Sequence, residues 1–419
     1  MNKAKSPLYY KRQFDGLLAE ALKTHSAVYL SGPRKAGKTS LARGACRGNY
    51  VSFNSPLLLA SVLDAPETFF RSLPENQLNV VDEAHFAAEL FEHAENEPDN
   101  NCSNSGQSSG NRYLLIGSMG LPVLFGHGAA PESVRELTLL PFSAAERRRV
   151  GTNFLRRLLI GKLTARKFDA VRLADEIEGA TFPELALNPG INREQWFDSL
   201  LSAVLQRDIQ TAIGIRSPER IVPLLVSLAI RVGGMLNDAS VIKETGLDAK
   251  TYAKYKAAAL YTFLTFEIEP WSGPNRIKKR LLRQSKIYFT DTNLLCYLMR
   301  RGLRDVLAGD PVTSERLFEN FIATEIVKQA AFISRTRIRH FSLSGGKEVD
   351  FVIEAENGAA VGVDVRFKPV LSDRDFDNLQ AMRTALGKNF NRGLIIYTGT
   401  EQTAFSDGLW AVPANALWE

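Results

Sequence analysis

Residues 32–39 read Gly-Pro-Arg-Lys-Ala-Gly-Lys-Thr and match the phosphate-loop pattern GxxxxGK[ST] at every required position. The loop follows a short apolar run, Ala27–Ser31, and precedes a segment with helical spacing, Thr39–Ala45. A glycine-rich turn between a strand and a helix presents successive backbone N–H groups, and the helix N-terminus adds the positive end of its dipole. The stretch therefore predicts a site for the phosphates of a nucleotide.

The polar groups of this loop have separate expected roles. The Lys38 ammonium would reach the β- and γ-phosphates, and the Thr39 hydroxyl would bind Mg²⁺. ATP and Mg²⁺ are therefore the expected cofactors. The residues predicted to bind the nucleotide are Gly32, Pro33, Arg34, Lys35, Ala36, Gly37, Lys38, Thr39 and Ser40.

A second apolar run, Leu78–Val81, ends in two carboxylates, Asp82 and Glu83. Ligands bind at the carboxyl ends of strands in open α/β sheets. Asp82 is therefore expected to hold Mg²⁺ through water, and Glu83 is expected to polarise the attacking water. The alternative is a chance acidic pair after a strand, which would require both motifs to arise by accident in the correct order. The pair predicts hydrolysis as well as binding.

Ser118 directly follows another strand-like run, Tyr113–Gly117. ATPases with both of these motifs place a polar residue there that senses the γ-phosphate. The alternative is that Ser118 is an ordinary turn residue. Strand-like and helix-like segments alternate up to about residue 150, with Val51–Phe53 as a further strand, and this order predicts an α/β fold with a parallel sheet. The polar segment His93–Arg112 is predicted to be a surface loop without a function of its own.

The composition is that of an ordinary soluble globular protein. The chain has 419 residues, 45% of them hydrophobic and 23% charged, which predicts two to four domains. Its three cysteines form no CxxC pair, so neither a cysteine zinc site nor a disulfide framework is indicated. No signal-peptide pattern and no apolar run of membrane-spanning length occur, which predicts a cytoplasmic protein.

After residue 150 the pattern becomes helical, and Asp238–Phe263 predicts a helix–turn–helix. Gly246 would end its first helix and Asp248 would cap the second. The apolar face of that second helix is expected to contain Ala253, Ala257, Leu260 and Leu264.

The stretch Asn275–Lys286 carries six Lys or Arg and no acid, and would form or follow a wing. Lys250, Lys254 and this stretch would then contact the phosphates of double-stranded DNA. The alternative is a winged helix used only for packing or protein contact.

With these motifs the chain resembles the predicted AAA+ ATPases of bacteria and archaea. The likeness rests on GPRKAGKT, VVDEAH, LLIGS and RELTLLPFSAAE, and continues through SLLSAVLQRDI, KIYFTDTNLL, ERLFENFIATEI and KEVDFVIE. It implies an AAA+ P-loop domain at residues 1–150 and a helical and winged-helix domain at residues 151–305. A small α/β domain at residues 306–419 would resemble PD-(D/E)xK nucleases.

The resemblance also implies a transition-state arginine, which such ATPases usually take from a neighbouring subunit of a homo-oligomer. Arg207, in the QRDI segment, is the first candidate and Arg135 the second. A surface salt bridge between Arg207 and a carboxylate is the alternative.

In PD-(D/E)xK nucleases an Asp and a later (D/E)xK bind a divalent metal. Asp350 and Asp364 occupy the metal positions here, and Glu319 would add a further carboxylate. Arg366 stands in place of the lysine, and a guanidinium cannot deprotonate water. We therefore expect the fold without cleavage.

Three hypotheses follow. The first is an ATPase whose nucleotide state moves the winged helix and the nuclease-like domain, and the second is a nucleotide-dependent DNA-binding regulator with little turnover. The third is an ATP-gated, metal-dependent nuclease.

Overall fold

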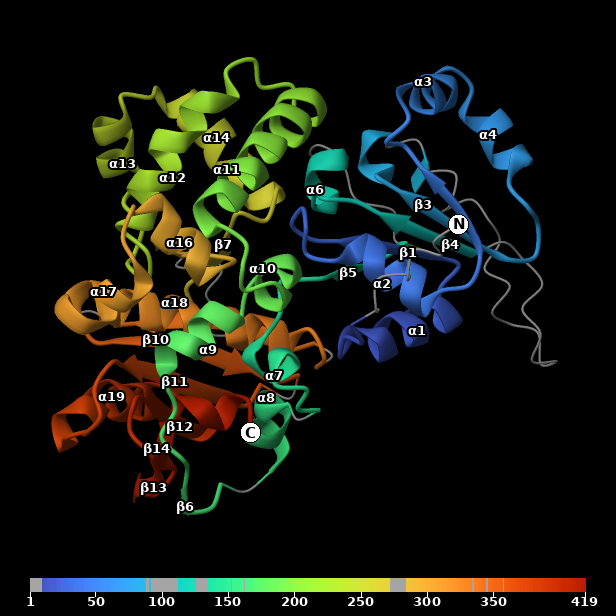
Figure 1. Ribbon diagram of the computed structural model, residues 1–419. Coiled ribbons are helices and arrows are strands. Elements are labelled where there is room, and N and C mark those ends of the chain that lie inside the picture. Colours follow the sequence, from blue (N-terminus) through green and yellow to red (C-terminus); the bar gives the residue numbers. More distant parts are fainter. Residues whose placement is uncertain are drawn as a thin grey trace. The chain divides into compact units, whose positions relative to one another are not determined.

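The computed structural model describes residues 10–87, 90–91, 112–125, 134–151, 153–161, 163–271, 284–333, 335–343, 346–356 and 358–419 (Figure 1). Most of the polar segment His93–Arg112, with Cys102, and residues 275–283 of the basic stretch lie outside these ranges. No helix within the described ranges is both long enough and apolar enough to cross a membrane.

The chain forms two compact units. Unit 1 contains Met1–Pro141, Asp198–Pro218 and Tyr261–Phe263, and unit 2 contains Phe142–Phe197, Glu219–Leu260 and Leu264–Glu419. The sequence predicted three domains instead, with boundaries near 150 and 305. Residue 305 does not separate compact units, because a strand from residues 166–167 joins the C-terminal sheet.

Unit 1 is built on a five-stranded sheet in the order β2-β3-β4-β1-β5. All its strand pairs are parallel, which confirms the predicted α/β class. The strands are β1 (Ala27–Ser31), β2 (Asn49–Ser52), β3 (Leu78–Asp82), β4 (Arg112–Ile116) and β5 (Val134–Thr138). Because β4 lies between β1 and β3, the turn after β4 emerges between the phosphate loop and the acidic pair.

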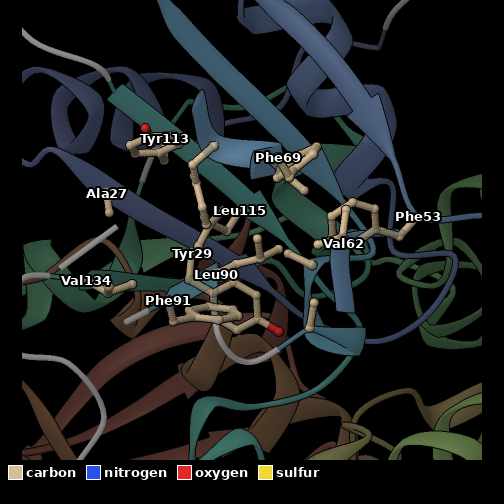
Figure 2. Packing of buried hydrophobic residues seen from close by; sticks show 14 of the residues in the cluster. Ala27, Tyr29, Phe53, Val62, Phe69, Leu90, Phe91, Tyr113, Leu115 and Val134 are labelled. Atoms are coloured by element: carbon tan, nitrogen blue, oxygen red, sulfur yellow. The ribbon is translucent and has the colours of Figure 1, made fainter. Parts of the chain in front are cut away.

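The helix α1 (Phe14–Thr24) precedes β1. The strands are connected by α2 (Lys38–Ala45), α3 (Pro56–Asp64), α4 (Pro66–Ser72), the 3₁₀ turn η1 (Ala84–Phe86) and α6 (Leu121–Leu124). A buried aromatic cluster packs against one face of the sheet (Figure 2). Within it the Tyr29 and Phe91 rings meet edge to face with centroids 4.9 Å apart. This packing fixes β1 and β4, from which the phosphate loop and Ser118 project.

The helical part of unit 2 contains α7 (Ala144–Arg147), α8 (Phe154–Ile160), α9 (Leu173–Gly179), α10 (Pro183–Leu187), α12 (Ile221–Ala229), α13 (Asp238–Thr245) and α14 (Ala249–Tyr261). The predicted end of α13 and the predicted cap of α14 are both confirmed. Gly246 adopts φ 65° after α13, and the Asp248 carboxylate accepts the Thr251 backbone N–H at 2.9 Å at the start of α14. Antiparallel strands β7 (Thr265–Ile268) and β8 (Lys286–Phe289) follow.

The predicted apolar face of α14 is only partly correct, because Leu264 is buried but Ala257 and Leu260 are half-buried. Ala253 is exposed, and the helix buries Tyr252, Tyr255, Ala258 and Ala259 instead. The two tyrosine rings have far more apolar surface to remove from water than the alanines do, so they set which side of the helix faces the core.

The C-terminal part of unit 2 is a seven-stranded sheet in the order β6-β13-β14-β12-β11-β10-β9. Its strands are β6 (Arg166–Lys167), β9 (Arg337–Ser342), β10 (Glu348–Glu354), β11 (Ala360–Arg366), β12 (Phe390–Tyr397), β13 (Glu401–Ser406) and β14 (Leu409–Pro413). The helices of this part are α16 (Thr292–Leu298), α17 (Leu303–Gly309), α18 (Pro311–Ala330) and α19 (Asp377–Leu386). The mixture of strands and helices in this part agrees with the α/β class predicted for residues 306–419.

Candidate nucleotide-binding site

The phosphate loop connects β1 to α2 at the carboxyl edge of the parallel sheet. Both of its motif glycines adopt positive φ, 141° at Gly32 and 97° at Gly37. A side chain on Gly32 would place its Cβ only 2.1 Å from the Leu139 carbonyl oxygen. Glycine is therefore required by close backbone approach at Gly32 and by left-handed conformation at Gly37. The Arg12 guanidinium, which the sequence did not single out, supports the loop by donating to the Ala36 carbonyl at 3.1 Å.

Lys38 begins α2 and its ammonium is enclosed by the loop. The Nζ atom donates to the carbonyl oxygens of Gly32 at 2.7 Å and Pro33 at 2.9 Å, and the residue is only 8% exposed. Burial lowers the pKa of Lys38 to about 8. A phosphate that replaced the two carbonyls would stabilise the charged form.

Thr39 and Asp82 meet as the two motifs predict. The Thr39 hydroxyl donates to Asp82 Oδ2 at 2.8 Å, and the Tyr50 hydroxyl donates to the same oxygen at 2.5 Å. A hydroxyl and a carboxylate side by side are the oxygen ligands that Mg²⁺ prefers. Tyr50 lies on β2, next to the strand that carries Asp82, and no sequence motif marked it.

Glu83 follows β3 in a left-handed conformation with φ 60°, which is uncommon for a residue with a long side chain. Its Oε1 accepts from Arg34 Nη1 at 3.1 Å, and its Oε2 lies 3.5 Å from His85 Nδ1. The predicted base therefore has one carboxylate oxygen, Oε1, in a hydrogen bond with Arg34.

Asp208 is the site residue that sequence reasoning missed. It lies on a nine-residue π-helix, η3 (Val204–Ala212), and is completely buried. Arg34 donates to it through Nε at 2.9 Å and Nη2 at 2.5 Å, and the Ser118 hydroxyl donates at 3.3 Å. Burial alone would raise the pKa of Asp208, but hydrogen bonds from His85 and Arg34 lower it. π-helices are rare and occur often at functional sites, so a long one here supports a role for this segment.

Ser118 also lies where the motifs predicted it, buried and within reach of Asp208 and His85. Its neighbour Gly117 leaves no room for a side chain, because a Cβ there would lie 2.2 Å from the Tyr29 hydroxyl. Tyr29 in turn donates to the Met119 carbonyl at 2.5 Å. The turn that carries Ser118 is thus fixed by the aromatic core beneath it.

Neither arginine proposed from the sequence contacts these groups. Arg207 donates to Asn54 at 3.1 Å on the surface, and its guanidinium lies 5.8 Å from the Phe86 ring centroid. Arg135 is exposed on β5, three residues before the strand ends at Thr138, which places it about 10 Å from the carboxyl edge along the strand. The arginine that does contact Glu83 and Asp208 is Arg34, from the loop itself.

A second charged cluster lies in unit 2, where a metal was predicted. Asp350 on β10 and Asp364 on β11 are both buried, but each binds a cation of the protein. Lys286 Nζ donates to Asp350 at 2.8 Å and Glu319 at 3.1 Å, and it pairs with Glu348 at 2.7 Å.

Arg366 donates to Asp364 at 2.8 Å in the same cluster. Among the residues that the structure describes, no three His, Cys, Asp or Glu side chains are grouped to hold a metal ion.

Lys286 is itself only 1% exposed. Burial alone would lower its pKa, but the charge of Asp350 and then that of Glu319 raise it well above the ordinary lysine value. Burial, and then the charge of Asp350, raise the pKa of Glu319 in the same cluster to about 7. The sequence had placed Lys286 in a basic, DNA-facing stretch, whereas the structure buries it.

Two family models match the chain, and both are described only as domains of unknown function. One, DUF8612, matches residues 173–305, and the other, DUF4143, matches residues 314–417. Uncharacterized proteins of Mycobacterium tuberculosis and Mycobacterium bovis are each 24% identical over 417 residues. The match covers 98% of this chain and 85% of each relative.

Solved structures give weaker likenesses. A mutant form of Thermotoga maritima RuvB is 17% identical, with 60% of this chain and 86% of that chain covered, at a TM-score of 0.24. A signal transduction ATPase with numerous domains from Pyrococcus horikoshii is 11% identical, with 76% and 48% covered, at a TM-score of 0.23. TM-scores this low do not establish a common fold.

Proposed function

We propose that this protein is an AAA+ type ATPase that hydrolyses ATP with Mg²⁺ at the carboxyl edge of the unit 1 sheet. The observation that carries the proposal is the contact between the two motifs. Thr39 at the start of α2 hydrogen-bonds Asp82 at the end of β3 across 2.8 Å, although 43 residues separate them. A glycine turn and a chance acidic pair have no reason to meet in this way.

Binding would begin at the loop. The Lys38 ammonium lies inside it on two backbone carbonyls, and charged phosphate oxygens are stronger acceptors than these carbonyls. Thr39 and Asp82 would hold Mg²⁺, which would neutralise charge on the phosphate oxygens. Glu83, which directly follows Asp82, would take a proton from the attacking water. Ser118, which follows the next strand of the chain, would report on the γ-phosphate.

The nucleotide state would reach the rest of the chain through the segment that carries Asp208. Residues Asp198–Pro218 belong to unit 1, but the chain on both sides of this segment belongs to unit 2. The helix α11 (Arg193–Ala203) leads directly into the π-helix. A change at Asp208 therefore has a short covalent route to the helices that would form the winged helix and on to the nuclease-like domain.

A nucleotide-dependent DNA-binding regulator is the second candidate. Exposed Lys250 and Lys254 on α14, and the helix–turn–helix order of α13 and α14, favour it. An ATP-gated nuclease is less favoured, because Lys286 and Arg366 already bind the carboxylates that a metal would need. The C-terminal domain would then keep a nuclease-like fold without the metal.

The decisive test is phosphate release by wild type, Lys38→Ala and Glu83→Gln, with and without double-stranded DNA. We expect wild type to turn over and both variants to lose at least about 100-fold, since each removes a group needed for the chemistry. Binding without turnover under every condition would favour the regulator. A rate that rises with protein concentration would indicate an arginine supplied between subunits, as the resemblance implies.

A further inference from the structure

We propose that Arg34, held in place by Asp208, is an arginine that completes the ATP site from within the same chain. The ion pair of Arg34 with Glu83 keeps the base engaged, and the γ-phosphate of ATP displaces that pair. This inference rests on the proposed ATPase function and adds a residue and a control step to it.

The geometry assigns the two halves of the guanidinium to different partners. Nε and Nη2 form a fork on the two oxygens of Asp208, at 2.9 and 2.5 Å, while Nη1 reaches Glu83 at 3.1 Å. A two-bond fork is the stronger and more directional contact, so Asp208 anchors the side chain. The single bond to Glu83 is the contact that a competing anion can replace without moving the anchor.

Because Arg34 and its two partners are largely buried, the guanidinium attracts an incoming anion strongly. The side chains of Arg34 and Glu83 are 13% and 14% exposed, and that of Asp208 is not exposed at all. Charges that are this shielded from water interact more strongly than surface pairs. The γ-phosphate of ATP carries more negative charge than one carboxylate, and it arrives in the loop to which Arg34 belongs.

The exchange would link nucleotide arrival to activation of the base. While Arg34 holds Oε1, that oxygen of Glu83 cannot accept a hydrogen bond from water in the same direction. Transfer of Nη1 to the γ-phosphate frees Oε1 and places a guanidinium on the charge that develops in the transition state. ADP, which has no γ-phosphate, would leave the Arg34–Glu83 pair closed.

The two arginines considered from sequence do not provide this contact within the chain. Arg207 is occupied at the surface by Asn54, and Arg135 lies three residues back along its strand. An arginine from a second subunit would add to Arg34 rather than replace it.

The test is a double-mutant cycle on nucleotide binding, combined with turnover. The affinities of ATPγS and ADP are measured with Mg²⁺ for wild type, Arg34→Gln, Glu83→Gln and the double variant, and phosphate release is measured for wild type and Arg34→Gln. Glu83→Gln removes the competitor, so it should tighten ATPγS binding about fivefold in the wild-type background and less than about twofold with Arg34→Gln. Turnover of Arg34→Gln should fall about 100-fold, with ADP affinity within about twofold of wild type.

Arg71→Ala is the matched control, because Arg71 is an exposed arginine of the same unit whose pair with Glu67 is equally exposed. It should change neither affinity nor turnover. If Arg34→Gln does not fold, Arg34→Lys keeps a cation beside Asp208 but cannot bridge both carboxylates, and the same loss of turnover is expected.

Four results would overturn the inference, and only the last would also overturn the proposed function. Equal tightening of ATPγS binding by Glu83→Gln in both backgrounds would show that Arg34 does not compete for Glu83. Turnover of a folded Arg34→Gln within about threefold of wild type would remove its catalytic role while leaving the proposed function intact. A parallel loss of ADP affinity would indicate a role only in loop structure. If wild type itself releases no phosphate, the proposed function and this inference fail together.

Discussion

Two lysines of this protein are buried to a similar degree, but their pKa values shift in opposite directions. Lys38 of the phosphate loop contacts two neutral carbonyl oxygens, and burial lowers its pKa to about 8. Lys286 of unit 2 contacts three carboxylates, which raise its pKa well above the ordinary value despite burial. The difference is the charge of the acceptors and not the depth of the side chain.

This difference separates a site that needs a ligand from one that is already satisfied. The charge of Lys38 has no carboxylate in contact among the described residues, so an incoming phosphate improves its surroundings. Lys286 already has Glu319, Glu348 and Asp350 as partners, and Asp350 is one of the carboxylates predicted to bind a metal. The cluster that the sequence predicted to bind a metal thus has a cation of the protein at its centre.

The largest expected effect is that of Lys286→Met on stability. Removing one partner of a buried ion cluster leaves the carboxylates without a counter-charge, which typically costs about 3–5 kcal/mol. Urea unfolding near neutral pH would measure the loss. Lys347→Met is the control, since its 3.5 Å pair with Asp377 is exposed, and should cost less than about 1 kcal/mol.

The same variant tests whether Lys286 excludes metal. With the ammonium gone, Mn²⁺ should raise the unfolding midpoint of Lys286→Met by more than it raises that of wild type, in which only the proposed unit 1 site can bind the ion. A wild type that is stabilised by Mn²⁺ through unit 2 would show that Lys286 does not occupy the cation position.

Lys38→Met should have the opposite profile, with little loss of stability and complete loss of function. Its acceptors are neutral, so removal of the ammonium leaves no unpaired charge, and the unfolding free energy should change by about 1 kcal/mol or less. ATP binding measured by calorimetry should fall below detection. A large destabilisation with ATP binding retained would contradict the interpretation of both lysines.

The pH dependence of stability should separate the two residues by the sign of their slopes. The folded chain holds the Lys38 proton less tightly than the unfolded chain, whose lysines titrate near about 10.4. Between about pH 8 and 10 wild type should therefore gain stability relative to Lys38→Met. Lys286 has a raised pKa, so its contribution is fully present below about pH 10.4 and is lost only above that value. The difference between wild type and Lys286→Met should stay level from about pH 8 to 10.

The sequence predicted the parts of the site that lie in continuous motifs. Gly32 and Glu83 directly follow strands, Asp82 ends β3, and Lys38 and Thr39 begin α2. Each of these places depends on a short stretch of local sequence. Asp208 is 174 residues from Arg34, and Lys286 is 64 residues from Asp350. Contacts between segments so far apart depend on tertiary packing, which no single motif encodes. The QRDI segment was singled out, but for Arg207 rather than for the buried aspartate beside it.

The smallest predicted effect concerns Tyr50, and it extends the comparison from the two lysines to the Mg²⁺ site proposed in unit 1. The hydroxyl donates to the Asp82 oxygen that also accepts from Thr39, and burial raises the pKa of Tyr50 to about 12, so it remains a donor at working pH.

Tyr50→Phe should cost about 1 kcal/mol of stability and raise the Mg²⁺ concentration for half-maximal turnover about tenfold, because the group that orients a metal ligand is lost. Tyr397→Phe, which loses a 2.7 Å hydrogen bond to the Glu401 carbonyl in unit 2, should cost as much stability without changing the Mg²⁺ requirement. If both variants shift the Mg²⁺ curve alike, Asp82 is not the metal ligand that Tyr50 orients.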